Sequence, residues 1–117
     1  MRLGLALAAS LSLGCGAQEK DTSDSGSAEA SCGHEIKVTW ETGGQALFRG
    51  RCCSCHSSTA TERFGAPEYL NYDTYEGVQE AAHAIRQAAL WDQVMPPGYP
   101  LSEEEQETLE SFLDCGL

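Results

Sequence analysis

Three residues in the stretch GRCCSCHSST, residues 50–59, have the types and spacing to hold a cofactor: Cys52, Cys55 and His56. They form a Cys-x-x-Cys-His motif, which is typical of covalent attachment of c-type haem. Two thiols three positions apart lie on one face of a helical turn, where they could add to the two vinyl groups of a porphyrin. The histidine directly after the second thiol could then bind the iron. The motif predicts haem c attached to Cys52 and Cys55, with His56 as an iron ligand.

The same motif allows two other interpretations. Its three side chains could bind zinc, with Cys32, His34 or Cys115 completing a tetrahedron, but zinc sites usually offer a second matched pair at short spacing. A disulfide scaffold would have to cross-link three cysteines crowded into four positions, which the geometry of the disulfide bond makes awkward. Haem attachment is favoured over both, and Cys53, inside the motif, has no assignable role.

A second iron ligand is predicted in the stretch VMPPGYP, residues 94–100. Met95 is followed by two prolines, which prohibit a helix and stiffen the loop, so a side chain there can be held at a fixed distance from the iron. A thioether ligand raises the reduction potential of haem relative to two imidazoles. His83 is the competing ligand, but it falls on the polar face of a predicted helix. His83 and His34 are both expected to be solvated.

The charge balance limits the classes of partner. The 117 residues include 18 Asp and Glu against 7 Lys and Arg, a formal net charge of −11. Nucleic acid is a poor candidate partner, because phosphate binding needs a basic surface. The acidic balance most often indicates a solvated surface, and it would favour a basic docking partner.

The first 31 residues have the composition of an export signal and a tether. Residues 1–14 join Arg2 to an apolar run that is too short to span a bilayer, as in a signal peptide. The run ends in LSLGC, which resembles a bacterial lipobox with Cys15 as the lipidated residue; an ordinary signal peptide is the alternative. Residues 15–31 lack any aromatic or large aliphatic side chain and are predicted to be a flexible tether. The chain is therefore expected to be exported and anchored in the periplasm or cell envelope by lipid.

Residues 32–117 are predicted to be a single all-α domain. Three segments show helical periodicity, and no segment alternates convincingly enough for a core strand. Each helix is expected to begin at a capping residue, and Gly116 is placed to end the last one. The predicted start residues and their partners are Thr42 with Gln45, Asp73 or Thr74 with Glu76, and Ser102 with Glu105.

The large apolar side chains of these helices are too few to enclose a core, which indicates that an apolar group is missing from the sequence. Haem could supply that surface. Hydrogen bonds from Trp91, the tyrosines or Arg86 to its propionates are possible. The residues expected to pack against the haem face are Leu47, Tyr69, Tyr72, Ile85, Trp91 and Val94.

Taken together, GQALFRGRCCSCHS, the Met-Pro-Pro loop and LSEEEQETLESFLDCGL resemble a small class I cytochrome c domain, as found on exported lipoproteins of bacteria. The resemblance covers roughly residues 43–117. It implies a small bundle of three main helices around a covalently attached haem, and it implies His56 and Met95 as the axial ligands.

The resemblance also implies several contacts. The first helix should cross the last, with Gly44 and Phe48 against Leu109, Phe112 or Leu113. The neighbourhood of Pro67 should accept a hydrogen bond from the histidine imidazole. If the helices cross in this way, Cys32 and Cys115 come close enough for a disulfide.

The function implied is that of a monohaem electron carrier, not an enzyme, that passes single electrons between redox partner proteins outside the cytoplasm. Two alternatives from other classes stay open. One is a haem enzyme or sensor whose iron lacks the methionine ligand. The other is an exported binding module stabilised by zinc or disulfides.

Overall fold

Six helical elements follow one another along residues 32–117, the part of the chain that the computed structural model describes. No strand occurs within these residues, which confirms the all-α prediction for them. The predicted signal peptide, the tether and Cys15 lie outside the described residues. The elements are η1 (Trp40–Gly44), α2 (Gln45–Arg51), α3 (Tyr75–Glu80), α4 (Ala82–Ile85), η2 (Arg86–Trp91) and α5 (Glu103–Cys115).

The first helical segment, η1 and α2, begins three residues earlier than predicted. Thr39, not Thr42, is the capping residue: its hydroxyl accepts a hydrogen bond from the Thr42 backbone N–H at 3.2 Å, and the Thr42 hydroxyl accepts one from the Thr39 N–H at 2.8 Å. The predicted pairing of Thr42 with Gln45 is therefore wrong. A reciprocal cap needs only two short side chains that accept from each other's backbone, and Thr39 and Thr42 provide them.

The second helical segment runs through α3, α4 and η2. Thr74 caps it by accepting from the Gly77 N–H at 3.1 Å, whereas the Asp73 carboxylate accepts from the Ser58 N–H at 2.7 Å and so holds the preceding loop. Thr74 was thus the correct alternative for the start of this segment. His83, on its polar face, is exposed as expected.

The third helix, α5, has the predicted ends. Ser102 and Glu105 form a reciprocal capping box, with hydrogen bonds of 3.2 Å and 2.9 Å. The helix ends at Cys115, and Gly116 follows as its C-cap. Acidic residues fill its first turn, where the helix dipole favours negative charge.

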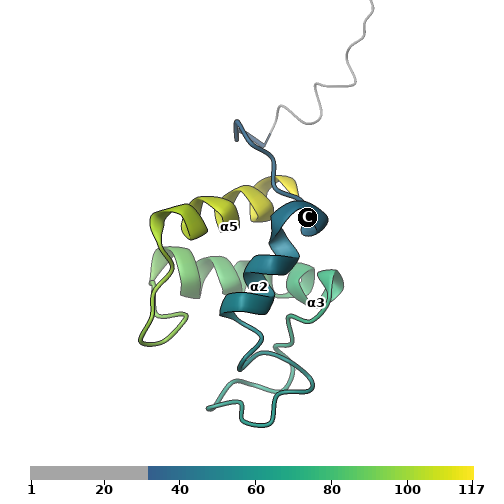
Figure 1. Cartoon of the computed structure of the whole chain (residues 1–117), viewed down its shortest axis with the longest axis vertical. Helices are drawn as coiled ribbons and strands as arrows, with labels where there is room; N and C mark the ends of the chain where they lie inside the picture. Colours follow the sequence, from purple (N-terminus) through teal and green to yellow (C-terminus); the bar gives the residue numbers. More distant parts are fainter. Residues whose placement is uncertain (1–31) are drawn as a thin grey trace, which may run out of the picture. The chain divides into compact units, whose positions relative to one another are not determined.

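The first and last helices cross at an aromatic cluster, as the resemblance implied (Figure 1). Phe48 and Phe112 are fully buried, with ring centroids 5.9 Å apart in an edge-to-face arrangement. Trp40 packs against both rings at 6.1 Å and 6.0 Å. Gly44 lies at the crossing, because a side chain there would meet the Phe112 ring. Edge-to-face packing contributes about 0.5–1.5 kcal/mol per pair beyond the area buried.

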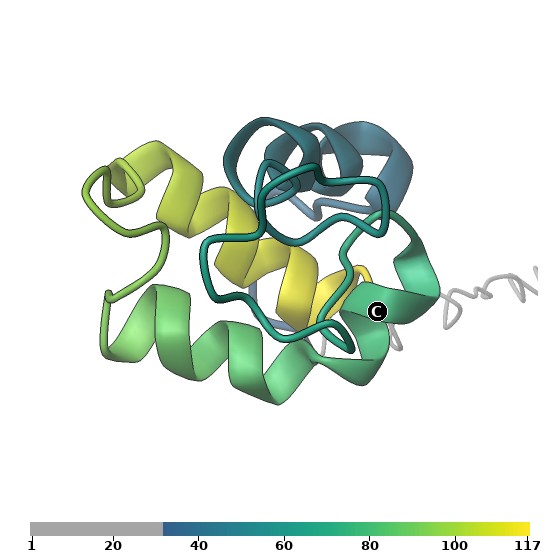
Figure 2. The same cartoon turned by 90° about the horizontal axis from the view of Figure 1, so that it is seen from below.

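The segment before η1 is fastened to the end of α5. Cys32 and Cys115 form a disulfide with their Cα atoms 5.2 Å apart, the pairing expected from the resemblance. The hydroxyl of Ser111, on α5, donates to the Ile36 carbonyl at 2.7 Å and accepts from the Val38 N–H at 3.0 Å. These contacts hold residues 32–38 along α5. Figure 2 shows the second helical segment running beside α5, with the loop of residues 52–74 in front of the helices in this view.

Within the described residues, no helix combines the length and apolar character needed to cross a membrane.

Candidate cofactor site

A largely apolar cavity of about 470 Å³ is lined by α2, α4, η2 and α5 and by the two loops that follow α2 and precede α5. Its size lies within the range of small-molecule sites in proteins. The buried side chains of Leu47, Ile85 and Leu109 form part of its floor. Every residue of the predicted haem site, Cys52, Cys55, His56 and Met95, lines this one cavity. The sequence-predicted site residues are thus brought together.

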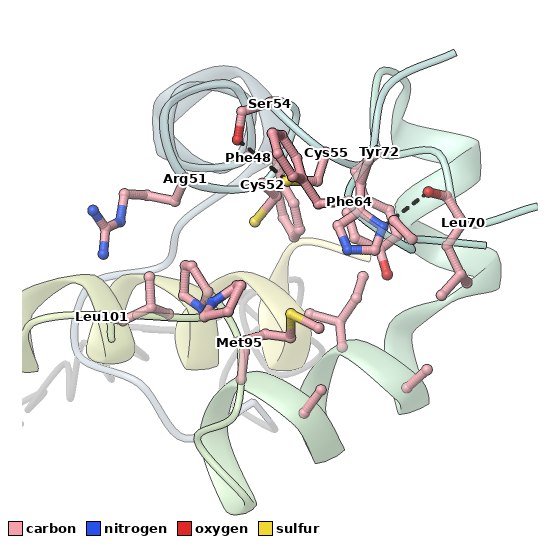
Figure 3. A pocket seen from close by; sticks show the side chains of 18 of the residues that line it. Phe48, Arg51, Cys52, Ser54, Cys55, Phe64, Leu70, Tyr72, Met95 and Leu101 are labelled. Atoms are coloured by element: carbon pink, nitrogen blue, oxygen red, sulfur yellow. Dashed lines mark hydrogen bonds between the residues drawn. The ribbon is translucent and has the colours of Figure 1, made fainter. Parts of the chain in front are cut away.

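The backbone turns tightly through the cysteine motif. α2 ends at Arg51, and the N–H groups of Cys52 and Cys53 both donate to the Phe48 carbonyl at 2.9 Å. The His56 N–H donates to the Cys52 carbonyl at 2.9 Å, which closes one more turn. This turn directs Cys52 and Cys55 to the cavity (Figure 3).

Cys53 does not share the position of Cys52 and Cys55 at the cavity. Its Sγ contacts the Tyr72 carbonyl at 3.5 Å, and the residue does not line the cavity. All three cysteines of the motif are free. Burial raises the pKa of Cys52 to about 12 and raises the pKa of Cys53 as well. The thiols of Cys52 and Cys53 are therefore protonated at neutral pH in this structure.

The imidazole of His56 is held in one tautomer. Its Nδ1 lies 3.1 Å from the Leu70 carbonyl oxygen, and because a carbonyl only accepts, Nδ1 must carry the proton. In the neutral ring the lone pair then lies on Nε2, and Nε2 has no hydrogen-bond partner among the described residues. The ring is buried and stacks on Tyr72, with centroids 4.6 Å apart and planes 20° apart. The imidazole is therefore oriented, and its Nε2 makes no hydrogen bond to the described residues; a histidine binds a metal through such a ring nitrogen.

The accepting carbonyl belongs to Leu70, three residues beyond Pro67. The resemblance implied an acceptor near Pro67, and the Leu70 N–H in turn donates to the Pro67 carbonyl at 3.0 Å. Pro67 therefore shapes the turn that presents Leu70, but its own carbonyl does not meet the imidazole.

Arg63 organises the loop that carries Leu70. Its guanidinium donates to four backbone carbonyls and to the side-chain oxygen of Asn71, at distances from 2.5 to 3.2 Å. One of the four carbonyls is that of Leu70, at 3.2 Å from Nη2. The same oxygen thus accepts from both His56 and Arg63.

Met95 lies on another wall of the cavity, on the loop between η2 and α5. Figure 3 shows its sulfur turned inward, on the side opposite Cys52 and Cys55. Its N–H donates to the Ala88 carbonyl at 3.1 Å, which ties the loop to the end of the second helical segment. The residue is 39% exposed, so it lies at the mouth of the cavity and not in its floor.

Arg51 fixes the Met95 loop from the other side. Its Nη2 donates to the carbonyls of Tyr99 and Pro100 at 2.6 Å and 3.1 Å. Its Nε lies 3.2 Å from a Glu105 carboxylate oxygen as an ion pair, but without the angle of a hydrogen bond. The sequence reasoning missed both arginines of the site, because backbone carbonyls as acceptors leave no sequence signature.

Several residues expected beside the haem do not line the cavity. Tyr69, Trp91 and Val94 are exposed, by 82%, 59% and 57%. Arg86 pairs instead with Asp114 at 2.6 Å. Leu47, Tyr72 and Ile85 do line it. Tyr69 and Val94 lie in irregular segments, and Trp91 precedes one, where periodicity gives no facing direction. Phe64 and Tyr99, which line the cavity, were missed for the same reason.

His34 was expected to be solvated, and it is only partly so. Its Nε2 contacts the Asp114 carboxylate at 2.7 Å, and the side chain is half-buried. Burial opposes ionisation of Asp114, but hydrogen bonds from His34 and Arg86 outweigh it and lower the pKa of this carboxyl.

The zinc interpretation lacks its fourth ligand. Cys32 and Cys115 form a disulfide, so neither offers a thiolate to a metal, and His34 is paired with Asp114. Within residues 32–117, no group of three or more His, Cys, Asp or Glu side chains is arranged to hold a metal ion.

Comparison of the chain with family models, curated proteins and solved structures gave no match.

Proposed function

We propose that residues 32–117 form a monohaem c-type cytochrome domain that carries single electrons. Haem would be attached through thioethers to Cys52 and Cys55, with His56 and Met95 as the axial ligands. Bound in this way, the iron supplies a one-electron couple between its ferrous and ferric states. With both axial positions filled by protein, no open position is left for a substrate, so the domain is proposed to be an electron carrier and not an enzyme.

The observation that carries this proposal is the state of His56. Its Nδ1–H is engaged by the Leu70 carbonyl, so Nε2 is left as a lone-pair donor at the wall of an apolar cavity. Proteins usually orient a metal-binding histidine through a hydrogen bond from the ring nitrogen that does not bind the metal, often to a carbonyl. The two thiols adjoining this imidazole and the thioether of Met95 line the same cavity. Imidazole and thioether suit iron, and the apolar lining suits a porphyrin face.

Other residues would keep water out of the site and hold the loop that carries Met95. Leu47, Ile85 and Leu109 exclude water from the cavity floor. Arg51 and the Ala88 carbonyl hold the Met95 loop in place. A thioether donor and an apolar surround both favour the ferrous state, so a relatively high reduction potential is expected.

The setting outside the cytoplasm is part of the proposal. A signal peptide over residues 1–14 and lipidation of Cys15 would place the domain in the periplasm or cell envelope on a membrane anchor. A disulfide between Cys32 and Cys115 suits such an oxidising compartment. The partners would be redox proteins with surfaces that tolerate an acidic docking face.

The partial exposure of Met95 favours a second candidate, a haem protein whose iron is open on that side. Wild-type protein and the variants Met95→Ala and Val94→Ala, made with a haem-attachment system, separate the two. Val94 is the matched control, because it adjoins Met95 but does not line the cavity.

Haem that stays with the wild-type protein after acid–acetone extraction, and is low-spin, supports the carrier. Loss of the methionine charge-transfer band in Met95→Ala alone assigns the ligand. A wild-type spectrum that is already high-spin supports the open-site alternative. Colourless wild-type protein from cells that attach haem to a control cytochrome contradicts both.

A further inference from the structure

The guanidinium of Arg63 uses all its hydrogen-bonding capacity on one loop. A guanidinium has five N–H groups. The five bonds of Arg63 reach the carbonyls of Ala66, Pro67, Leu70 and Ser57 and the side chain of Asn71. All five acceptors are neutral. Arg63 lines the cavity, and no carboxylate is hydrogen-bonded to its guanidinium, although the charge of Asp73 interacts with it.

Arg63 and His56 converge on a single oxygen. The Leu70 carbonyl oxygen lies 3.1 Å from His56 Nδ1 and 3.2 Å from Arg63 Nη2. When one carbonyl oxygen accepts from two donors, each withdraws electron density that the other could use. A cationic donor withdraws more than a neutral one. The bond from Nδ1–H is therefore weaker than it would be to a carbonyl with no second donor.

The strength of this bond decides how strongly Nε2 donates electrons. A strong acceptor at Nδ1 makes the ring more basic and stabilises the higher oxidation state of a metal bound at Nε2. A weakened acceptor has the opposite effect. A nearby positive charge also disfavours the ferric state, and a low local dielectric strengthens that interaction.

We propose that Arg63 is a positioning residue for His56 that raises the reduction potential of the domain, acting through the Leu70 carbonyl and through its own charge. The inference rests on the proposed function, because it concerns the iron that His56 would bind. It assigns a redox role to Arg63, whose hydrogen bonds reach neither Cys52 nor Cys55.

The experiment uses holoprotein of wild type, Arg63→Gln, Arg63→Lys and Arg49→Gln. Arg49 is the matched control, because it is exposed on α2 and does not line the cavity. Two quantities are measured: the midpoint potential, and the Nδ1 proton resonance of His56 in the reduced, diamagnetic protein. The second reports directly on the bond to Leu70.

Arg63→Gln is expected to lower the ratio of reduced to oxidised protein at a fixed ambient potential roughly tenfold, which is about 59 mV for one electron. Arg49→Gln should change it by about twofold or less, because an exposed charge is screened. Arg63→Lys keeps the positive charge but loses the planar guanidinium with its five donors. Its midpoint potential should therefore lie between those of wild type and Arg63→Gln. In both Arg63 variants the Nδ1 proton should move downfield as its bond strengthens.

A role in loop stability alone predicts the reverse, because a loosened loop would weaken the Nδ1 bond and move its proton upfield. That result, or a potential of Arg63→Gln equal to that of Arg49→Gln, would overturn the inference. If Arg63→Gln does not attach haem, the Nδ1 shift in Arg63→Lys decides, and no downfield shift there overturns it. Wild-type protein without a low-spin haem refutes the proposed function itself, and the Arg63 inference with it.

Discussion

Gly44 and Phe112 pack so closely that a Cβ atom added at Gly44 would lie 2.9 Å from Cδ2 of Phe112. The Phe112 ring is fully buried and packs against both Phe48 and Trp40, so moving it aside would disturb these contacts. This contact sets how near the first and last helices approach, and their approach defines one wall of the cavity.

Gly44→Ala should therefore destabilise the fold, although alanine is the better helix former. Overpacking a core typically costs about 1–3 kcal/mol. Gly50→Ala is the control on α2, because a Cβ there meets nothing within 4 Å; it should be neutral or stabilise by up to about 1 kcal/mol. Chemical denaturation of both variants measures the difference. Equal stabilities would show that the helices separate without penalty.

The three cysteines of the motif should differ in haem attachment. Cys52→Ala and Cys55→Ala should each leave a single thioether, because only these two thiols line the cavity. Cys53→Ala should keep both thioethers, since its thiol is turned toward the Tyr72 carbonyl. The α band of the alkaline pyridine haemochrome distinguishes two, one and no thioethers. A two-thioether spectrum from Cys52→Ala would show that Cys53 replaces it and would contradict the assignment.

The carboxylate of Asp114 should stabilise the fold at neutral pH but not in acid. Its pKa is lowered in the folded protein, so its contribution is complete above the unfolded value of about 3.9 and is lost as pH falls through the folded value. Asp114→Asn should cost roughly 0.5–1 kcal/mol at pH 7, the scale of a partly exposed ion pair. The difference from wild type should shrink towards pH 3.

Denaturation at several pH values tests this dependence. Glu110→Gln is the control on the same helix, because Glu110 is exposed. A deficit of Asp114→Asn that does not change with pH would mean that the charge of Asp114 contributes nothing to the fold.

Removal of the disulfide should lower stability more than any of these substitutions. The bond joins residues 83 positions apart, and closing a loop of that length stabilises by roughly 4 kcal/mol in the chain-entropy model. The double variant Cys32→Ala/Cys115→Ala should show this loss in denaturation, and wild type without reductant is the reference. A thiol reductant should change wild type in the same direction and leave the double variant unchanged. A loss below about 1 kcal/mol would contradict the entropic account.

The sequence was most informative where local chemistry has a fixed spacing. The capping box of Ser102 and Glu105 and the helix end at Gly116 follow from short-range hydrogen bonds, and both were predicted correctly. The Cys-x-x-Cys-His spacing predicted that Cys52, Cys55 and His56 act together, and all three line one cavity. The Thr39 cap was missed, because two candidate threonines stand three residues apart and each can serve as the other's partner.

The loops carried most of what could not be predicted. Neither residues 52–74 nor 92–101 have a repeat that tells which side chains face inward, so Tyr69 and Val94 were assigned wrongly and Phe64 was missed. The shared acceptor at Leu70 depends on a backbone oxygen, which any residue type would supply. The position of this oxygen depends on the path of the whole loop, and no pattern of residue types predicts it.

The bond between Cys32 and Cys115 also has a mechanical consequence. Residues 32–115 are closed into a covalent ring, so tension applied to the chain on either side of that ring passes through two sulfur atoms and not through the helices. Such tension would therefore not load the contact between Phe48 and Phe112 or the walls of the cavity. A single backbone cut between the two cysteines would likewise leave one connected molecule, whose halves separate only when the disulfide is reduced.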